Sequence, residues 1–309
     1  MKTLIKLTLI SLLMLGEGVM ADERAPGQTE IALDVELTSG KAEVRVDDVP
    51  FFGPGQALDA EASIVASLPA NSILGPGLND VLLHFTPTDS GLGNEPVFRA
   101  RFGYAPAGTF PDAFSDRPFA ILVDIRPDPQ QPGGFKLEQA IQGQPLLTGK
   151  LNAPTLTTLP DGALEVSLQL DVGVDLPTQK WKGGRQLSDD ATTRRQVESM
   201  MRRAHSALAA GPATIKQELG PMLQRLAATV GMTVDEAIVT EYAPYVDKSM
   251  GFELQPFDAS QSRLVIMGNG RLATLIPPPV VFHNAEIGES GGPMLIYWQD
   301  ANGEWQIIH

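Results

Sequence analysis

The sequence predicts a two-domain protein in which an antiparallel β-sandwich is followed by an α+β domain. Apolar residues recur at every second position from Thr29 to about Leu176, which is typical of strands with one buried face. They recur at every third or fourth position from Asp190, as on helices, and strand-like alternation returns beyond Pro256. A chain of 309 residues is long enough for two cores. We therefore expect a sandwich over about residues 26–180 and an α+β domain over about residues 188–309.

The first twenty-one residues have the pattern of an export signal. Lys2 and Lys6 form a basic start, residues 7–15 form an apolar run, and Val19-Met20-Ala21 has the small-x-small form of a cleavage site. The apolar run is shorter than the roughly 20 residues that span a bilayer, so we interpret it as a removed signal rather than an anchor. We expect cleavage after Ala21 and a periplasmic protein, or alternatively a secreted one.

Composition narrows the classes of partner. The chain has 23 Lys and Arg residues against 37 Asp and Glu residues, which gives a net charge of −14. This balance argues against nucleic acid and anionic lipid, because both attract basic residues. The chain contains no Cys, which excludes disulfides, thiol catalysis and lipid attachment at a cysteine. We expect a mature protein that is soluble and has no membrane anchor.

Eight or nine short strands are expected in the first domain. Ile31–Leu37 and Ala42–Val46 read as two separate alternating strands, while Phe119–Val123 is continuously apolar, as in a central strand covered on both faces. Gly- and Pro-rich turns separate the runs. The stretch Leu74–Leu83 resembles the last turn and strand of many extracellular sandwich modules, in which Pro-Gly-x-Asn precedes an alternating strand. The resemblance is structural and implies no ligand.

Three helices are expected after Trp181. The first covers about Asp190–Ala210, with Ser188 or Asp189 as its cap. The second starts near Ile215, is broken or kinked at Gly220-Pro221 and ends at Gly231. Thr233 and Glu236 form a capping box that opens a third helix through about Tyr242.

Two hairpins are expected near the C-terminus. Arg263–Met267 pairs with Leu272–Ile276, and Leu295–Trp298 pairs with Trp305–Ile308. The ending Asn302–Ile307 resembles the final strand of nuclear-transport-factor-two-like and cystatin-like α+β families. That resemblance implies a curved sheet wrapped around a helix, forming a cone used for binding or small-molecule chemistry. No catalytic residue of those families has an equivalent here.

The sharpest catalytic motif surrounds Ser290. Gly288–Pro293 resembles the Gly-Asp-Ser-Gly-Gly-Pro segment of chymotrypsin-like serine proteases, which implies Ser290 as nucleophile with His84 and Asp124 as candidate partners. The predicted helices and the short chain after Ser290 do not fit that fold, so we favour a structural loop before a strand. The four His residues share no metal-ligand spacing, and Asp300–Glu304 reads as a hairpin turn rather than a calcium loop. We expect neither a metal nor a cofactor.

Two groups of residues are candidates for binding. Arg195, Arg202 and Arg203 share a face of the first helix with Arg194 nearby, so an anionic ligand or acidic partner could dock there. The alternative is a solvated face paired with carboxylates. The aromatic residues Tyr297, Trp298 and Trp305 could line a groove, or pack in the core.

These features favour an exported, non-catalytic binding or inhibitor protein that recognises another protein or a cell-envelope polymer. An enzyme of this size normally shows a clustered nucleophile, base or metal set. A periplasmic immunity-type protein would fit the export signal and the acidity. The alternative is an enzyme, either a hydrolase that uses Ser290 or a small-molecule enzyme that uses the cone.

Overall fold

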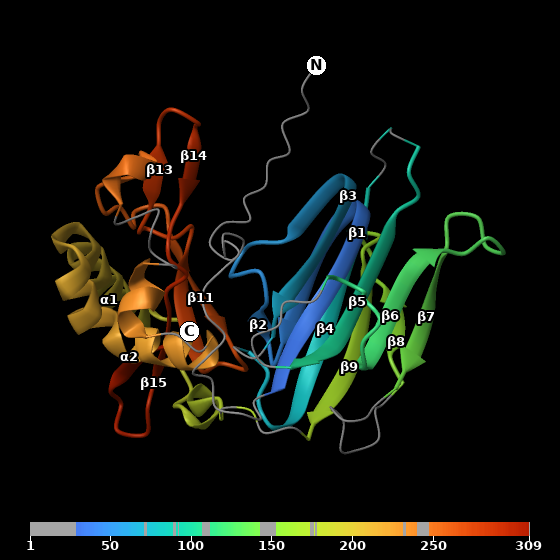
Figure 1. The fold of residues 1–309 in the computed structure, drawn as a ribbon, viewed down its shortest axis with the longest axis horizontal. Helices are drawn as coiled ribbons and strands as arrows, with labels where there is room; N and C mark the ends of the chain where they lie inside the picture. The colour runs from blue at the N-terminus through green and yellow to red at the C-terminus, as the bar shows by residue number, and fades with distance from the viewer. Residues whose placement is uncertain are drawn as a thin grey trace. The chain divides into compact units, whose positions relative to one another are not determined.

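The fold is described from a computed structural model (Figure 1). The described residues are 29–70, 73–88, 91, 93–106, 112–142, 153–173, 176, 178–230, 233–239 and 247–308. The predicted signal peptide with its cleavage site at Ala21 lies outside them and stays a prediction. Within them the chain divides into two compact units at Lys180/Trp181, called here the N-terminal and C-terminal units. No described helix is both long enough and apolar enough to cross a membrane.

The N-terminal unit is a single antiparallel sheet of nine strands, which are the blue to yellow-green arrows of Figure 1. The strands are β1 (Thr29–Val46), β2 (Val49–Pro50), β3 (Leu58–Pro69), β4 (Gly77–Pro87), β5 (Val97–Pro106), β6 (Phe119–Pro127), β7 (Phe135–Ile141), β8 (Thr155–Thr158) and β9 (Leu164–Val172). Their order is β7-β6-β5-β1-β4-β9-β8, with β2 and β3 also paired to β1. The antiparallel, strand-rich architecture is confirmed, but one connected sheet replaces the two separate sheets of the expected sandwich.

The long strand β1 is the reason that the sheet is continuous. Its first part, to Thr38, pairs with β5, and its second part, from Gly40, pairs with β4. The prediction of two strands here is wrong, because the chain does not reverse between them. Ser39 instead adopts φ 48°, and the register with β3 shifts between Thr38 and Gly40. This bulge lets Leu37 and Ala42 both be buried although their positions differ in parity.

The sheet curls into a near-barrel around an apolar core. The ring of Phe85 on β4 lies 5.7 Å from that of Phe98 on β5 and 6.2 Å from that of Phe135 on β7. Strand β7 therefore faces β4 although three strands separate them in the sheet order. The predicted inward positions of β4, β5 and β9 are buried. Strand β6 is not central as expected, because only β7 lies beyond it.

The Pro-Gly-x-Asn turn before β4 is held by a buried amide. The Asn79 side chain accepts a hydrogen bond from the backbone N–H of Gly75 at 2.9 Å. It donates to the carbonyl oxygens of Gly75 at 2.9 Å and Gly77 at 2.7 Å. A buried amide that satisfies three backbone groups fixes the start of the strand.

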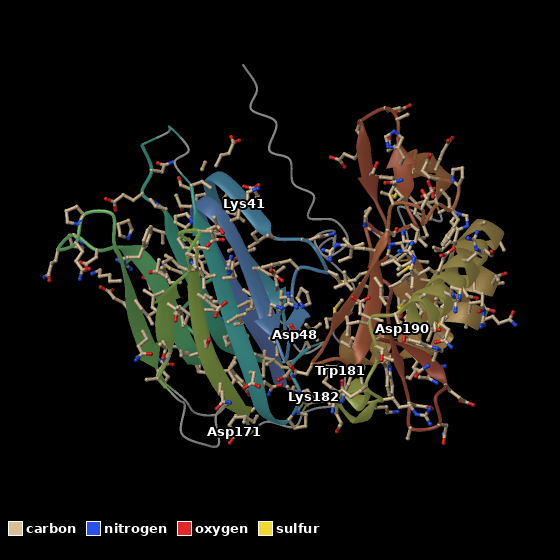
Figure 2. The ribbon with its side chains drawn as sticks, turned by 180° about the vertical axis from the view of Figure 1, so that it is seen from behind. Lys41, Asp48, Asp171, Trp181, Lys182 and Asp190 are labelled. Atoms are coloured by element: carbon tan, nitrogen blue, oxygen red, sulfur yellow. The ribbon has the colours of Figure 1, made fainter. Side chains whose placement is uncertain are left out.

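Two long helices open the C-terminal unit after a short 3-10 turn, η1 (Lys180–Gly183). Helix α1 (Ala191–Ala210) is capped by Asp190, labelled in Figure 2, whose carboxylate accepts hydrogen bonds from the backbone of Thr192 and Thr193. These bonds lower the pKa of Asp190 below its usual value. The cap lies one residue beyond the predicted Asp189, because Asp190 has extended backbone and a side chain that reaches those N–H groups.

Helix α2 (Pro212–Val230) runs through the predicted break at Gly220-Pro221. Its buried residues Ile215, Leu219 and Leu223 belong to the core of this unit. Tertiary burial of that face outweighs the local penalty of Gly and Pro. The capping box is confirmed: Glu236 accepts a hydrogen bond from the Thr233 N–H at 2.7 Å, and the Thr233 hydroxyl accepts one from the Glu236 N–H at 3.2 Å. Residues 234–239 are helical, and the predicted continuation to Tyr242 lies outside the described residues.

Two antiparallel sheets complete the C-terminal unit. The larger has the order β11 (Arg263–Met267), β12 (Leu272–Ile276), β15 (Ile296–Gln299) and β16 (Trp305–Ile308), so both predicted hairpins are confirmed. Helix α1 packs against β12, and α2 packs against β16. The smaller sheet, which follows the 3-10 turn η2 (Lys248–Met250), has the order β10 (Glu253–Leu254), β13 (Phe282–Asn284) and β14 (Glu289–Gly291).

Candidate binding surface and a serine–histidine pair

The small sheet places Ser290 beside a histidine that the sequence did not single out. Ser290 lies opposite His283 on β13, and His283 in turn lies opposite Glu253 on β10. Directly opposed residues point to the same side of a sheet, so the three form one row. The Nδ1 of His283 lies 2.9 Å from the Oγ of Ser290. The sequence does not reveal that Ser290 pairs with His283, because no recognisable hairpin motif joins the two strands.

The turn of the same hairpin and the 3-10 turn η2 each present one large apolar side chain to solvent. Asn284 is buried and organises them: its Nδ2 donates to the Met250 carbonyl at 2.9 Å, and its Oδ1 accepts from the backbone N–H of Glu286 at 3.0 Å. The backbones of Met250 and Ile287 both bond this amide, and the two residues are 41% and 59% exposed. Exposed large apolar residues on neighbouring stretches of backbone are a feature of interaction sites.

Four exposed carboxylates belong to the same two segments, residues 247–254 and 284–291: Asp247, Glu253, Glu286 and Glu289. No described Lys or Arg side chain forms an ion pair with any of them. The hydroxyl and the backbone N–H of Ser249 lower the pKa of Asp247, which keeps it ionised. We call the six residues Asp247, Met250, Glu253, Glu286, Ile287 and Glu289 the tip surface. Its chemistry complements a segment that is both basic and apolar.

The predicted partners of Ser290 have other contacts. His84 lies on β4, where its Nε2 is 3.5 Å from the Thr86 hydroxyl. Asp124 lies on β6 and pairs with Arg126 and, at 3.3 Å, with Arg99. Asp124 is also nearly buried beneath these arginines. The hydroxyl of Ser290 has instead the His283 ring as its neighbour.

The arginines of helix α1 are largely engaged within the C-terminal unit. Arg202 pairs with Glu198 at 3.0 Å and lies over the Phe257 ring at 4.2 Å. Arg203 pairs with Glu218 at 2.6 Å, whereas Arg195 contacts the hydroxyl of Thr192 at 3.3 Å. Arg194 donates to the carbonyls of Ser262 and Ala259 and so fixes a loop. Arg202 and Arg203 are therefore paired with carboxylates, whereas Arg194 and Arg195 bond carbonyl and hydroxyl oxygens.

The aromatic candidates lie in or against the core. Tyr297 and Trp298 are buried, and Trp305 is partly buried against the core formed by α1, α2 and the larger sheet. Burial raises the pKa of the Tyr297 hydroxyl well above its usual value. The turn between β15 and β16 also has a structural explanation, because Asp300 Oδ1 accepts hydrogen bonds from the N–H groups of Asn302 and Glu304, both at 2.9 Å.

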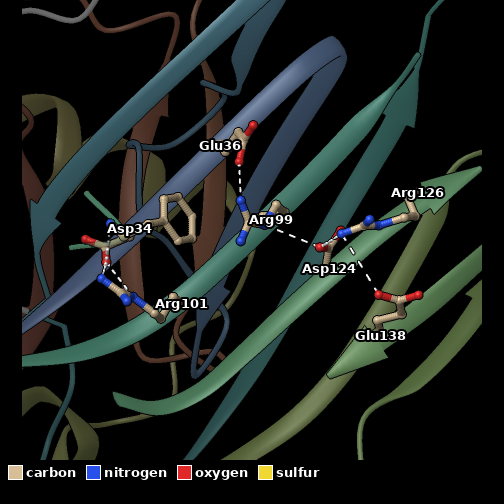
Figure 3. A network of polar contacts seen from close by, with 8 residues as sticks. Asp34, Glu36, Arg99, Arg101, Asp124, Arg126 and Glu138 are labelled. Atoms are coloured by element: carbon tan, nitrogen blue, oxygen red, sulfur yellow. Dashed lines mark hydrogen bonds and ion pairs between the residues drawn. The ribbon is translucent and has the colours of Figure 1, made fainter. Parts of the chain in front are cut away.

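A network of charged residues crosses the outer face of the N-terminal sheet (Figure 3). Register aligns Glu36, Arg99, Asp124 and Glu138 in one row across β1, β5, β6 and β7. Arg99 bonds Glu36 at 2.6 Å and approaches Asp124, which also pairs with Arg126. Sequence alone does not reveal this network, because each charged residue alternates with core residues and is expected simply to face solvent.

Comparison of the chain with protein-family models, curated proteins and solved structures found no match. Among the described residues, no group of three or more His, Asp or Glu side chains is arranged to hold a metal ion. The assignment of function therefore depends on the geometry of the tip surface and of the serine–histidine pair.

Proposed function

We propose that the protein is an exported, non-catalytic recognition protein that binds another protein through the tip surface. The observation that carries the proposal is that exposed Met250 and Ile287 and four exposed carboxylates all belong to residues 247–254 and 284–291, which form the small sheet and its adjoining turns. Apolar side chains supply the contact area, and carboxylates that form no ion pair with any described Lys or Arg select for basic partners. The net charge of −14 extends that selection over longer range. An inhibitor of a basic effector, such as an immunity-type protein, is one form of this function.

Capture from periplasmic and competitor-cell extracts tests the proposal. The mature protein is immobilised in three forms: wild type, a tip variant with Met250→Ser and Ile287→Ser, and a control variant with Val65→Ser and Leu78→Ser. The control removes apolar side chains of similar exposure, 57% and 58%, from the N-terminal sheet. A partner that wild type and control retain, and the tip variant loses, supports the proposal.

The other outcomes of this experiment are equally informative. Recovery of no protein by the wild type at any salt concentration contradicts a binding function. Equal recovery by all three forms leaves a binding function but rejects the tip surface as its site.

A second candidate function is an acyl hydrolase built on the row Glu253–His283–Ser290, favoured by the 2.9 Å contact between His283 and Ser290. In such a reaction the Ser290 oxygen would attack a carbonyl carbon while His283 takes its proton. The histidine would return that proton to the leaving group, and water would then release the acyl group. No described hydrogen bond joins Glu253 to His283, and Ser290 is exposed, so the pair lacks the enclosure that usually activates a serine.

A serine-reactive fluorophosphonate probe separates the two functions. The recognition function predicts that wild type, Ser290→Ala and the control Ser260→Ala remain equally unlabelled. Labelling of wild type and Ser260→Ala, with loss in Ser290→Ala, would establish the hydrolase instead.

A further inference from the structure

Residues 112–118, between β5 and β6, fold back over the outer face of the N-terminal sheet. The backbone N–H of Phe114 donates to Asp34 at 3.1 Å, and Arg101 donates to the Ser115 carbonyl at 2.9 Å. Arg117 pairs with the same Asp34 carboxylate. The Phe114 ring lies against Arg101, with 5.3 Å from the ring centre to the guanidinium carbon. This segment therefore seals Asp34 between itself and the sheet.

The sealed cluster has an unbalanced charge. Asp34 is completely buried, and the side chains of Arg101 and Arg117 are only 7% and 8% exposed. Two guanidinium groups thus share one carboxylate. The nearby carboxylates Glu36 and Asp124 do not restore the balance, because Arg99 pairs with both of them and Arg126 pairs with Asp124. One positive charge in excess remains in a place from which water is excluded, which is unfavourable without a counter-ion.

Buried donors without partners mark where that counter-ion would bind. The Nε and Nη1 of Arg117 and the Oγ of Ser115 are buried and have no hydrogen-bond partner among the described residues. The Nη2 of Arg117 bonds Asp34 and, at 3.3 Å, the Ser67 hydroxyl, which fixes the guanidinium. Its free N–H groups therefore lie on the two flanks of Nη2, where a small anion could accept from either one.

Gly103 allows the guanidinium to lie against the backbone of β5. A Cβ at this position would lie 3.1 Å from the Arg117 Cζ and 3.3 Å from its Nε, closer than most packed side chains approach. The absence of a side chain at residue 103 therefore permits the observed position of Arg117.

From these observations we propose that a small monovalent anion binds beside Arg117 and holds residues 112–118 on the sheet. Chloride and a small carboxylate such as formate share the required chemistry, one negative charge and a compact acceptor. Water alone could satisfy the free N–H groups but would leave the excess charge. This site is independent of the tip surface and of the proposed binding function.

Thermal unfolding of the mature protein tests the site. Sodium chloride or sodium formate replaces sodium isethionate, a bulky anion, at constant ionic strength. The unfolding temperature of wild type should rise with the concentration of the small anion until the site is saturated. A rise with only one of the two anions identifies the anion that the site prefers. Arg117→Gln should abolish the rise. Arg126→Gln, a more exposed guanidinium of the same sheet face, should retain it. Equal responses to small and bulky anions would overturn the proposal.

Crystals grown in bromide give a second test that does not depend on a variant that folds. An anomalous peak within hydrogen-bonding distance of Arg117 Nε or Nη1 is expected. Water or empty density at both atoms would overturn the site, whatever the behaviour of Arg117→Gln.

Discussion

Asp34 shows how a single carboxylate fixes a part of the fold that has no regular structure. It accepts hydrogen bonds from Ser67 at 2.6 Å, Arg101 at 2.8 Å and the Phe114 backbone at 3.1 Å, and it pairs with Arg117. Strands β3, β1 and β5 and the segment 112–118 are thereby joined at one point. A buried ion pair of this kind is costly to break, because the remaining charges lose their only compensation.

We predict that Asp34→Asn lowers the free energy of unfolding by about 3–5 kcal/mol, the usual cost of leaving buried charge unpaired. Equilibrium urea unfolding measures the change. The matched control is Asp59→Asn, which breaks the exposed pair of Lys41 with Asp59 and should leave the midpoint almost unchanged. Similar small shifts for both variants would show that the Asp34 cluster is not held as described.

Tyr297 gives a prediction with a defined pH dependence. Its hydroxyl is buried without a hydrogen-bond partner among the described residues, so Tyr297→Phe should raise stability at pH 7 by about 1 kcal/mol. Burial raises the pKa of this hydroxyl above its usual 10.0, so the unfolded state ionises first as the pH rises. The Tyr297 contribution to stability therefore falls above pH 10.0, and the advantage of the Phe variant should grow there. Thermal unfolding at neutral and alkaline pH measures both effects, and a less stable Phe variant would contradict them.

For single residues, the sequence indicates which side chains have suitable chemistry but not which side chains they contact in the fold. Ser290 was singled out from its Gly-rich motif, whereas His283 was not, because no spacing rule links two residues that meet across a hairpin. Arg117 and Asp34 are 83 residues apart in the sequence. They meet because the strands pair in register and residues 112–118 fold back over the sheet. The acidic and apolar residues of the tip surface likewise match no sequence motif. They suggest a binding site only because the fold brings their two segments together.

At the scale of elements, periodicity predicted most strands and helices, and the errors have local causes. Alternation located the inward residues of β4, β5 and β9, and the change of period located α1. The bulge at Ser39 divides β1 into two alternating runs in the sequence, because it changes the parity of the buried positions. The break at Gly220 was read from local propensity, which tertiary burial overrides.

Gly220→Ala tests the continuity of helix α2. Gly220 lies inside the helix, and apart from its chain neighbours and its own helix backbone no atom would lie within 4 Å of a Cβ there. Alanine should therefore raise the free energy of unfolding by up to about 1 kcal/mol, the usual difference in helix propensity, reduced by the contact of its Cβ with the following Pro221. Gly40→Ala is the contrasting variant, because its Cβ would lie 2.4 Å from the Phe85 ring and should destabilise the sheet. Loss of stability in Gly220→Ala, measured by urea unfolding, would indicate a helix that is interrupted as the sequence predicts.

At the scale of the whole molecule, the chain divides into two compact units, and the boundary lies slightly before the predicted start at residue 188. Trp181 is buried, and its ring lies near Gly268 in the C-terminal unit. Arg185 donates to the Ala301 carbonyl at 2.8 Å, and the Leu187 N–H bonds the Gly270 carbonyl at 2.8 Å. Residues 181–187 therefore belong with the helices and sheets that follow them. Periodicity missed them because they form neither a helix pattern nor a strand pattern.

We predict that residues 22–180 and residues 181–309 each unfold cooperatively when expressed separately. A fragment of residues 188–309 should be less stable than 181–309 by about 3–5 kcal/mol, since it lacks a buried tryptophan. Circular dichroism during urea unfolding measures both. Equal stability of the two C-terminal fragments, or an unfolded N-terminal fragment, would contradict the division into independent units.

The tip surface is the central functional claim, and hydrogen–deuterium exchange tests it most directly. The mature protein is mixed with a short peptide in which Lys and Leu alternate, and separately with its Glu and Leu counterpart. The account predicts that only the basic peptide slows exchange at residues 247–254 and 284–291, that salt weakens the effect, and that Glu286→Gln with Glu289→Gln removes it. Equal protection by both peptides, or protection confined to other parts of the chain, would contradict the account.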